Sequence, residues 1–274
     1  MTAIMFHHFH DGKTWKPSQG SLPAEQFKQL LEANPHVDLV FDDGLKCQLD
    51  VAVPVLKDLG RKAIFCVTTG HFEDTPATVE PYRWLRHELG LEEFYRQFHN
   101  FVVRPSDNPD AFPDFYTKAD RQFQLARDSM KKKSYNSIMK TMIKGYRNDA
   151  KNNIQTIAKQ VYLSKLDLQN LSQMGFEVGL HSHTHPMNMA DLTASEQRTE
   201  WMSNYDWVYS CTDVKPTVAS YPSNSYNGVT MAILKREGIT KAYRADEEGH
   251  RRLKRMELPR IDHHEACIRA GIKI

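Results

Sequence analysis

Leu39-Val40-Phe41-Asp42-Asp43-Gly44 is the stretch that says most about the fold of this chain. Its apolar residues close a predicted buried strand, Val37–Phe41, and a helix over Leu49–Leu59 and a strand over Lys62–Thr68 follow. Strands that alternate with helices favour a parallel sheet with right-handed crossovers. The two carboxylates therefore stand at the carboxyl end of a parallel strand, which is where α/β folds place their functional sites.

A second predicted strand ends in a group of histidines. Phe176–Leu180 leads directly into His181-Ser182-His183-Thr184-His185, in which His181 and His185 have a spacing suited to a shared metal ion. A carboxylate and two imidazoles form a common catalytic zinc set that leaves one position for water. Taken alone, each group also has a structural interpretation. The acidic pair could form a turn or a helix cap, and the histidines could be hydrogen-bonded structural residues. Both halves stand at predicted strand ends, and together they indicate a metal-dependent hydrolase.

Alternation of strands and helices resumes at Leu163 and continues towards the end of the chain. Thr193 and Glu196 form a capping box that predicts the start of a long helix, Thr193–Cys211. The later predicted elements are a strand over Thr217–Tyr221, a helix over Val229–Glu237, and strands over Lys241–Arg244 and Met256–Ile261.

The middle of the chain, from about Phe72 to Val161, contains no convincing buried strand. Prolines separate two helical stretches there, which predicts a helical subdomain inserted into one domain that spans residues 1–274. The second helical stretch is rich in basic residues. This basic surface has two interpretations, as a solvated helix face or as a lid or contact surface for an anionic substrate. Its basic residues are Arg121, Arg127, Lys131, Lys132, Lys133, Lys140, Lys144, Arg147, Lys151 and Lys159.

Composition narrows the class of protein. Hydrophobic residues make up 40% of the chain and charged residues 26%, which is typical of a folded domain. The formal charge of +2 gives no indication of nucleic-acid binding. The four cysteines form no C-x-x-C pair, which suits reduced thiols. No secretory signal and no apolar run of membrane-spanning length is visible, so we expect a cytoplasmic protein without a transmembrane segment.

Phe41-Asp42-Asp43-Gly44 and His181-Ser182-x-x-His185 resemble the first two motifs of the polysaccharide deacetylases, the NodB-homology family. The resemblance covers about Val37–Val67 and Val161–Arg260, and the helical segment lies outside it. It implies an α/β fold, a (β/α) barrel of seven strands and irregular shape. It also implies removal of N- or O-linked acetyl groups from sugars with a divalent metal, Zn²⁺ first, and Co²⁺, Ni²⁺ or Mn²⁺ as alternatives.

The same resemblance suggests individual roles. Asp42 resembles the general base, and the expected metal ligands are Asp43, His181 and His185. His183 occupies a variable position of the motif. Ala219-Ser220-Tyr221-Pro222-Ser223 resembles the third motif, so Tyr221, Pro222 and Ser223 are expected to line the substrate groove, with the main-chain N–H of Ser223 as oxyanion donor. Many relatives pair the base with an arginine where Ser220 stands, so either the base here is oriented in another way or that role has moved elsewhere in the chain.

Three histidines and one arginine complete the candidate site. His263 and His264 are candidates for the general acid, although both could equally be surface residues. His7 follows the first strand and is expected close to the metal, as a substrate-binding residue or an alternative acid. Arg260 is expected either to reach the substrate pocket or to form an ion pair at the surface.

Two further functions stay open at this point. One is a metal-dependent amidase that acts on a non-sugar C–N bond, and the other is a non-catalytic relative that binds carbohydrate. The expected partner is an acetylated sugar, oligosaccharide or glycolipid, and no nucleic acid is expected. The sequence carries no signal for oligomeric state.

Overall fold

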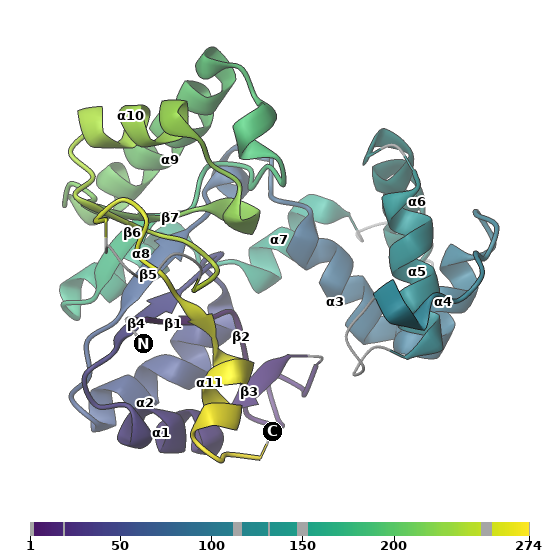
Figure 1. The fold of residues 1–274 in the computed structure, drawn as a ribbon, viewed down its shortest axis with the longest axis horizontal. Coiled ribbons are helices and arrows are strands. Elements are labelled where there is room, and N and C mark those ends of the chain that lie inside the picture. The colour runs from purple at the N-terminus through teal and green to yellow at the C-terminus, as the bar shows by residue number, and fades with distance from the viewer. Residues whose placement is uncertain are drawn as a thin grey trace. The chain divides into compact units, whose positions relative to one another are not determined.

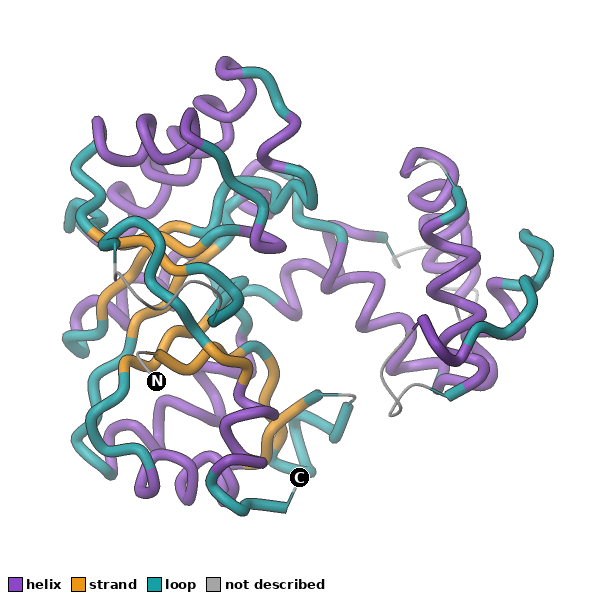
Figure 2. The backbone as a smooth tube through the Cα atoms, viewed as in Figure 1, coloured by secondary structure: helices purple, strands orange, loops and turns teal. Residues whose placement is uncertain are grey.

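A computed structural model describes residues 3–18, 20–111, 117–130, 132–146, 153–247 and 254–273. Its centre is a sheet of seven parallel strands, drawn in orange in Figure 2. The sheet curls into a half-barrel with helices around it, as Figure 1 shows, and this confirms the predicted seven-stranded (β/α) barrel. In spatial order the strands are β8 (Lys241–Tyr243), β7 (Val218–Ser220), β6 (Glu177–Leu180), β5 (Ile64–Val67), β4 (Asp38–Phe41), β1 (Ala3–Phe6) and β9 (Ile261–Asp262).

Aromatic rings in register hold the middle strands together. Phe6 pairs with Phe41, and Phe41 pairs with Phe65, across β1, β4 and β5. Their rings stack with centroids 5.1 Å and 4.6 Å apart, and Phe27 meets them edge-on from a neighbouring helix. All four side chains are fully buried. Burial of such large rings supplies much of the stability of a core, so the strand ends that carry the acidic pair rest on a rigid base.

The last strand is shorter than the sequence predicts. Met256–Ile261 was expected to form one strand, but β9 contains only Ile261 and Asp262. Leu258 pairs with Tyr243 of β8, and after Pro259 the chain moves across to pair with β1. Because proline has no N–H to donate, it ends the first pairing and lets the chain change neighbours. This crossing places the side chain of Arg260 inside the sheet.

Helices cover the sheet, and most of them begin or end where the sequence predicts. The long helix α9 (Ala194–Thr212) starts at Thr193, whose side chain and that of Glu196 form the expected capping box. The predicted helix over Leu49–Leu59 is a π-turn, Gln48–Ala52, followed by α2 (Val53–Asp58), because Pro54 has no N–H for the regular pattern. The other elements of this unit are α1 (Ala24–Ala33), α8 (Lys165–Gln173), α10 (Gly228–Arg236), α11 (His263–Arg269), and the small pair β2 (His8–His10) and β3 (Ser21–Pro23).

Residues Thr78–Ala158 form a second compact unit made of helices. Its own apolar core includes Phe94, Phe98 and Phe123, whose rings lie within 5.3 Å of one another in the pairs Phe94–Phe123 and Phe98–Phe123. Of the predicted basic surface, Lys140 and Lys144 are exposed, whereas Lys131, Arg147 and Lys151 lie outside the described residues. The helices are α3 (Val79–Leu89), α4 (Leu91–Phe98), α5 (Lys118–Asp128), α6 (Lys132–Gly145) and the start of α7 (Ile154–Val161).

The described helices also bear on the membrane question. Not one of them combines the length and the apolar character that crossing a membrane requires.

Candidate functional site

The acidic pair lies in a tight turn at the carboxyl end of β4. Asp43 has a left-handed conformation with φ 71°, which is strained for a residue other than glycine. Gln48 holds the turn, because its Nε2 donates to the main-chain oxygens of Asp42 at 2.7 Å and His7 at 2.9 Å. The hydroxyl of Thr68 donates to the main-chain oxygen of Asp43 at 3.0 Å. The two carboxylates therefore point in different directions from a fixed backbone.

The two histidines come from the turn that follows β6. Ser182 and His185 both have positive φ, 61° and 54°. This folds the segment so that the rings of His181 and His185 face the acidic turn. The main-chain N–H of His181 donates to Oδ1 of Asn204 on α9 at 3.0 Å. The strain at these positions and at Asp43 is concentrated where the functional groups lie, as is common for binding and catalytic sites.

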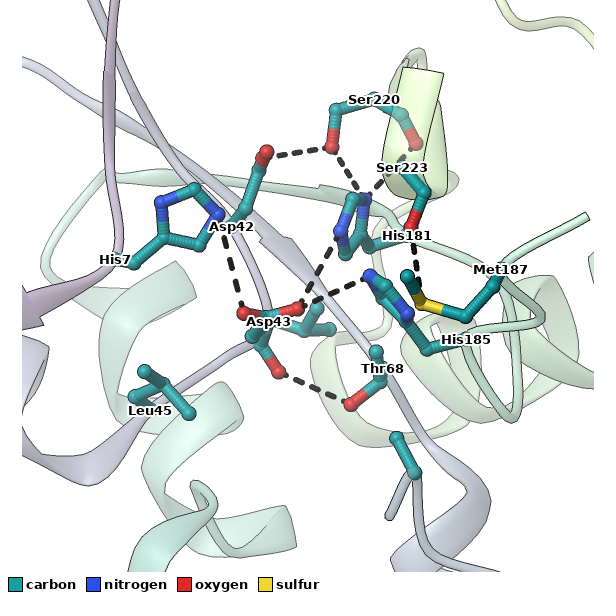
Figure 3. Close-up of polar contacts among 12 residues, drawn as sticks. His7, Asp42, Asp43, Leu45, Thr68, His181, His185, Met187, Ser220 and Ser223 are labelled. Carbon is teal, nitrogen blue, oxygen red and sulfur yellow. Dashed lines mark hydrogen bonds and ion pairs between the residues drawn. The ribbon is translucent and has the colours of Figure 1, made fainter. Parts of the chain in front are cut away.

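Asp43, His181 and His185 together form a site that suits a metal ion (Figure 3). Oδ1 of Asp43 lies 3.5 Å from Nε2 of His181 and 3.6 Å from Nε2 of His185. Ligands at 2.0–2.2 Å around a tetrahedral zinc ion are about 3.4 Å apart, so both distances from Asp43 are close to the required separation, and all three ligand atoms lie within 4.8 Å of one another. The donor set of one carboxylate and two imidazoles fits zinc and similar cations.

Ser220 fixes which nitrogen of His181 can bind a metal. Nδ1 of His181 lies 3.0 Å from the main-chain oxygen of Ser220. A carbonyl oxygen can only accept, so this contact places a proton on Nδ1 and leaves Nε2, which faces Asp43, as the nitrogen that can bind a metal. Partners of this kind orient metal-binding imidazoles in many proteins. The tautomer that ligation requires is therefore built into the fold.

Asp42 has a different environment from Asp43. Its carboxylate forms a bidentate ion pair with Arg260, with Nη1 and Nη2 each 2.8 Å from an oxygen, and it also accepts from the hydroxyl of Ser220 at 2.7 Å. Burial by itself would raise the pKa of Asp42, but the nearby positive charge, chiefly Arg260, outweighs it and lowers the pKa to about 2. Asp42 is thus held as an anion beside the ligands without joining them.

The pKa values of the three candidate ligands reflect the same crowding. Burial opposes the charge of Asp43, but hydrogen bonding and charge from His181, His185 and His7 hold its pKa well below the usual range. Burial also opposes protonation of His181, yet Asp42 and Asp43 raise its pKa overall. For His185 burial dominates and its pKa is lowered. A metal cation bound among these groups would supply the positive charge that stabilises the two carboxylates, in place of protonated histidines.

Arg260 is the residue that orients Asp42, a role that the sequence left unassigned. Its side chain is 1% exposed, so it neither lines a substrate surface nor forms a surface ion pair. Nε donates to the main-chain oxygen of Arg244 at 2.7 Å, and the rest of the guanidinium faces Asp42. The serine at position 220 indicated that Asp42 is oriented in another way or that the role of the arginine has moved elsewhere, but nothing local in the sequence pointed to Arg260.

The third-motif segment forms the turn after β7. The ring of Tyr221 is 1% exposed and its hydroxyl donates to the main-chain oxygen of Met256 at 2.7 Å, so this side chain supports the turn from inside. Pro222 is also buried. Ser223 has a φ of 51°, and its hydroxyl lies 3.2 Å from Sδ of Met187, beside His185 (Figure 3). Among these three residues, Ser223 is the one next to the metal-site turn.

The three candidate histidines occupy three different environments. Nε2 of His7 lies 4.0 Å from Oδ2 of Asp43, and its side chain is 28% exposed, so it combines proximity with access. His263 is buried against Phe6, with ring centroids 6.0 Å apart, and burial lowers its pKa to about 4. His264 is exposed on the first turn of α11. His7 therefore lies at the site, whereas the ring of His263 is part of the core.

The sequence and the fold are similar to known proteins. Residues 122–242 match the family model described as polysaccharide deacetylase, which includes both histidines and the third motif but not the acidic pair. A search of curated proteins finds no match. Among solved structures, the deacetylase PplD of Streptococcus pyogenes, in complex with acetate, has a TM-score of 0.54 and 16% identity over 96% of this chain and 91% of that one.

Two further solved structures have the same fold. IcaB from Ammonifex degensii has a TM-score of 0.56 and 12% identity, over 98% of this chain and 95% of that one. A polysaccharide deacetylase from Bacillus cereus has a TM-score of 0.52 and 12% identity, over 95% of this chain and 64% of that one. At such low identity these similarities establish the fold alone, so the chemistry has to be argued from the site.

Proposed function

Since residues 122–242 match the family model described as polysaccharide deacetylase, we propose that the chain is a member of this family, a metal-dependent hydrolase that removes an N- or O-linked acetyl group from a carbohydrate. The observation that supports the proposal most is the arrangement of Asp43, His181 and His185 as a ligand set, with Asp42 held beside them as a separate anion. One carboxylate is available for the cation and one for the proton, so ligation and base catalysis do not compete for the same group.

A divalent cation bound by these three residues would act as a Lewis acid and lower the pKa of water in the site. Asp42 then has the position of the proton acceptor. Its pKa of about 2 makes it a weak base, so it can take a proton only from water that is already acidified. Oδ1 of Asp42 accepts from both Ser220 and Arg260, which leaves Oδ2, at an ion-pair distance of 2.8 Å from Nη2 of Arg260, as the freer oxygen for the proton.

The turn after β7 has the geometry to assist. We place the oxyanion donor at the main-chain N–H of Ser223, which has a left-handed conformation in the turn next to the metal site. Substrate binding also falls to His7, which is partly exposed and lies next to the carboxylate of Asp43. These assignments use side chains and backbone that are fixed before substrate arrives.

The function is tested by acetate release from acetylated sugars with and without a chelator. The apoprotein and the protein loaded with Zn²⁺, Co²⁺, Ni²⁺ or Mn²⁺ are compared on N-acetylated oligosaccharides, O-acetylated sugars and simple non-sugar amides. We expect metal-dependent acetate release from a sugar substrate. Release from the non-sugar amides alone would support the amidase alternative, and binding of sugars without any turnover would support the non-catalytic one.

Asp42→Asn is the matched variant for this assay. Because it keeps the shape of the side chain and leaves Asp43 intact, it should retain bound metal and lose activity by roughly 10²- to 10⁴-fold, the usual contribution of a general base. Undiminished acetate release from Asp42→Asn would rule out the base assignment.

A further inference from the structure

The turns that carry the metal ligands are bonded to the two chain segments that lead into and out of the helical unit. We define these two segments, residues 68–77 and 159–163, as the stem. The main-chain N–H groups of Thr69 and Gly70 donate to the main-chain oxygen of His183, at 3.3 Å and 2.7 Å. On the outgoing side, the N–H of Leu163 donates to the oxygen of Gly44, the residue after Asp43, at 2.9 Å. Both ligand turns therefore rest on the stem.

The side chain of His183 is the main polar connection on the incoming side. It is 7% exposed, and its Nδ1 lies 3.0 Å from the hydroxyl of Thr69. Its Nε2 lies 3.5 Å from Oε2 of Glu73 and 3.4 Å from the hydroxyl of Thr75. A carboxylate can only accept, so this geometry suits Nε2 as the donor towards Glu73 and Nδ1 as the acceptor from Thr69. The ring therefore contacts the stem through both of its nitrogens.

Asn204 extends this connection to the metal ligand His181. Its Nδ2 donates to the hydroxyl of Thr69 at 3.0 Å, and its Oδ1 accepts from the main-chain N–H of His181 at 3.0 Å. Thr69 thus accepts from Asn204 and donates to His183. The result is a continuous chain of hydrogen bonds from His183 through Thr69 and Asn204 to the backbone of His181.

Close packing makes the contact between ligand turn and stem stiff. A Cβ atom at Gly70 would lie 2.2 Å from the main-chain oxygen of Thr75 and 2.9 Å from that of His183, so only glycine permits this approach. The two sides of the stem are also bound to each other. Nε2 of His71 lies 2.8 Å from the main-chain oxygen of Leu163, and the hydroxyl of Tyr162 donates to that of Ala77 at 3.1 Å.

We propose that His183 is a positioning residue for the metal site: with Thr69 it holds the turn between His181 and His185 against the stem, and so sets the separation of the two imidazoles. The inference rests on the proposed metal-dependent function. It assigns a task to the histidine between the two ligands, which takes no part in ligation. It also means that metal binding and the conformation of the stem are coupled, since a coupling between two sites acts in both directions.

The test compares Zn²⁺ affinity, measured by competition with a chromophoric chelator, with thermal stability. His183→Leu removes both hydrogen-bonding nitrogens at similar volume, and Thr69→Val removes the bridging hydroxyl with little change of shape. Both should bind Zn²⁺ about 10- to 100-fold more weakly, the usual loss when a partner behind the ligands is removed. The conservative Thr69→Val keeps the test decisive if His183→Leu does not fold.

Arg61→Met is the control for a purely structural loss. The guanidinium of Arg61 donates to the main-chain oxygens of Leu31, Asn34 and Val37, which precede β4 and lie at the opposite end of that strand from Asp42. This variant should melt at a lower temperature and keep wild-type Zn²⁺ affinity. If His183→Leu and Thr69→Val behave like Arg61→Met, the positioning role is wrong, while the proposed function stands.

Hydrogen exchange of the wild-type protein gives a second readout that needs no activity. Zn²⁺ should slow exchange at the amides of Thr69, Gly70 and Leu163, which donate to the ligand turns. Unchanged exchange at all three with Zn²⁺ bound would overturn the coupling. A wild-type protein that binds no Zn²⁺ at all would overturn the proposed metal site and this inference together.

Discussion

Nδ1 of His181 donates to the main-chain oxygen of Ser220 at 3.0 Å, and Nε2 of the same ring lies 3.5 Å from Oδ1 of Asp43. His181 therefore has its ligating nitrogen set by the backbone of the adjacent strand. His181→Ala should lose most of its bound metal and its metal-dependent activity. Metal content after dialysis, measured by atomic emission, checks this, with the exposed His264→Ala as control. Full metal content in His181→Ala would remove His181 from the ligand set.

The ion pair between Arg260 and Asp42 should matter for stability as well as for catalysis. Arg260→Met leaves a buried carboxylate without its partner, and breaking a buried pair in this way typically costs about 3–5 kcal/mol. Denaturant unfolding at pH 7 measures the loss, and Arg61→Met shows what removal of a less buried arginine costs. A difference below about 1 kcal/mol between Arg260→Met and wild type would contradict a strong pair.

The same pair predicts how this stability difference depends on pH. The pKa of Asp42 is lowered from its ordinary value of 3.8 to about 2 in the folded protein. A lowered carboxyl pKa contributes stability that is fully present above the unfolded value and is lost as pH falls through the folded one. The stability advantage of wild type over Arg260→Met should therefore shrink between about pH 4 and pH 2. An advantage that stays constant over this window would mean that Asp42 does not feel the charge of Arg260.

The ring of His263 predicts a pH effect in the same direction but at higher pH. Burial lowers its pKa from 6.5 to about 4, so the unfolded chain takes up a proton first as pH falls. Stability should drop between about pH 6.5 and pH 4, by up to roughly 3 kcal/mol from this group, and level off below that range. His263→Phe, which can keep the stacking on Phe6, should flatten the drop and retain activity. An equal pH slope in the variant would show that other groups cause it.

Asp42 and Arg260 show how much of the fold and of the candidate site can be predicted from the sequence. The strand ends with their acidic and histidine motifs are local features. Their alternation with helices predicted a parallel sheet, and the resemblance of the two motifs to those of the polysaccharide deacetylases implied the seven-stranded barrel. The partner of Asp42 is 218 residues away and depends on how the chain crosses from β8 to β9 at Pro259. No local pattern encodes such a contact, because it arises only when the two strands are placed in the sheet.

The hydrogen-bonding partners of the site illustrate the same limit. Gln48, Asn204 and Thr69 carry no motif, and each is recognisable only from the main-chain groups that it reaches. Tyr221 shows the converse, since its place in a groove-lining motif suggested substrate contact while its ring is buried in the turn. Motifs therefore predicted where functional groups gather, and packing decided which side chains face the site.

His7 should be the histidine whose removal affects substrate turnover most, apart from the metal ligands. It is partly exposed and lies 4.0 Å from Asp43, whereas His263 is buried and His264 is on the outer part of α11. His7→Gln should lower kcat/KM for acetate release by about 10- to 100-fold, at the lower end of what a positioned side chain contributes. His264→Gln should stay within about twofold of wild type. Both variants are assayed at saturating metal with metal content measured alongside, because His7 is close enough to Asp43 to affect binding. A loss of activity confined to His264→Gln, with His7→Gln unchanged, would assign the substrate contact to His264 at the start of α11 rather than to His7 at the end of β1.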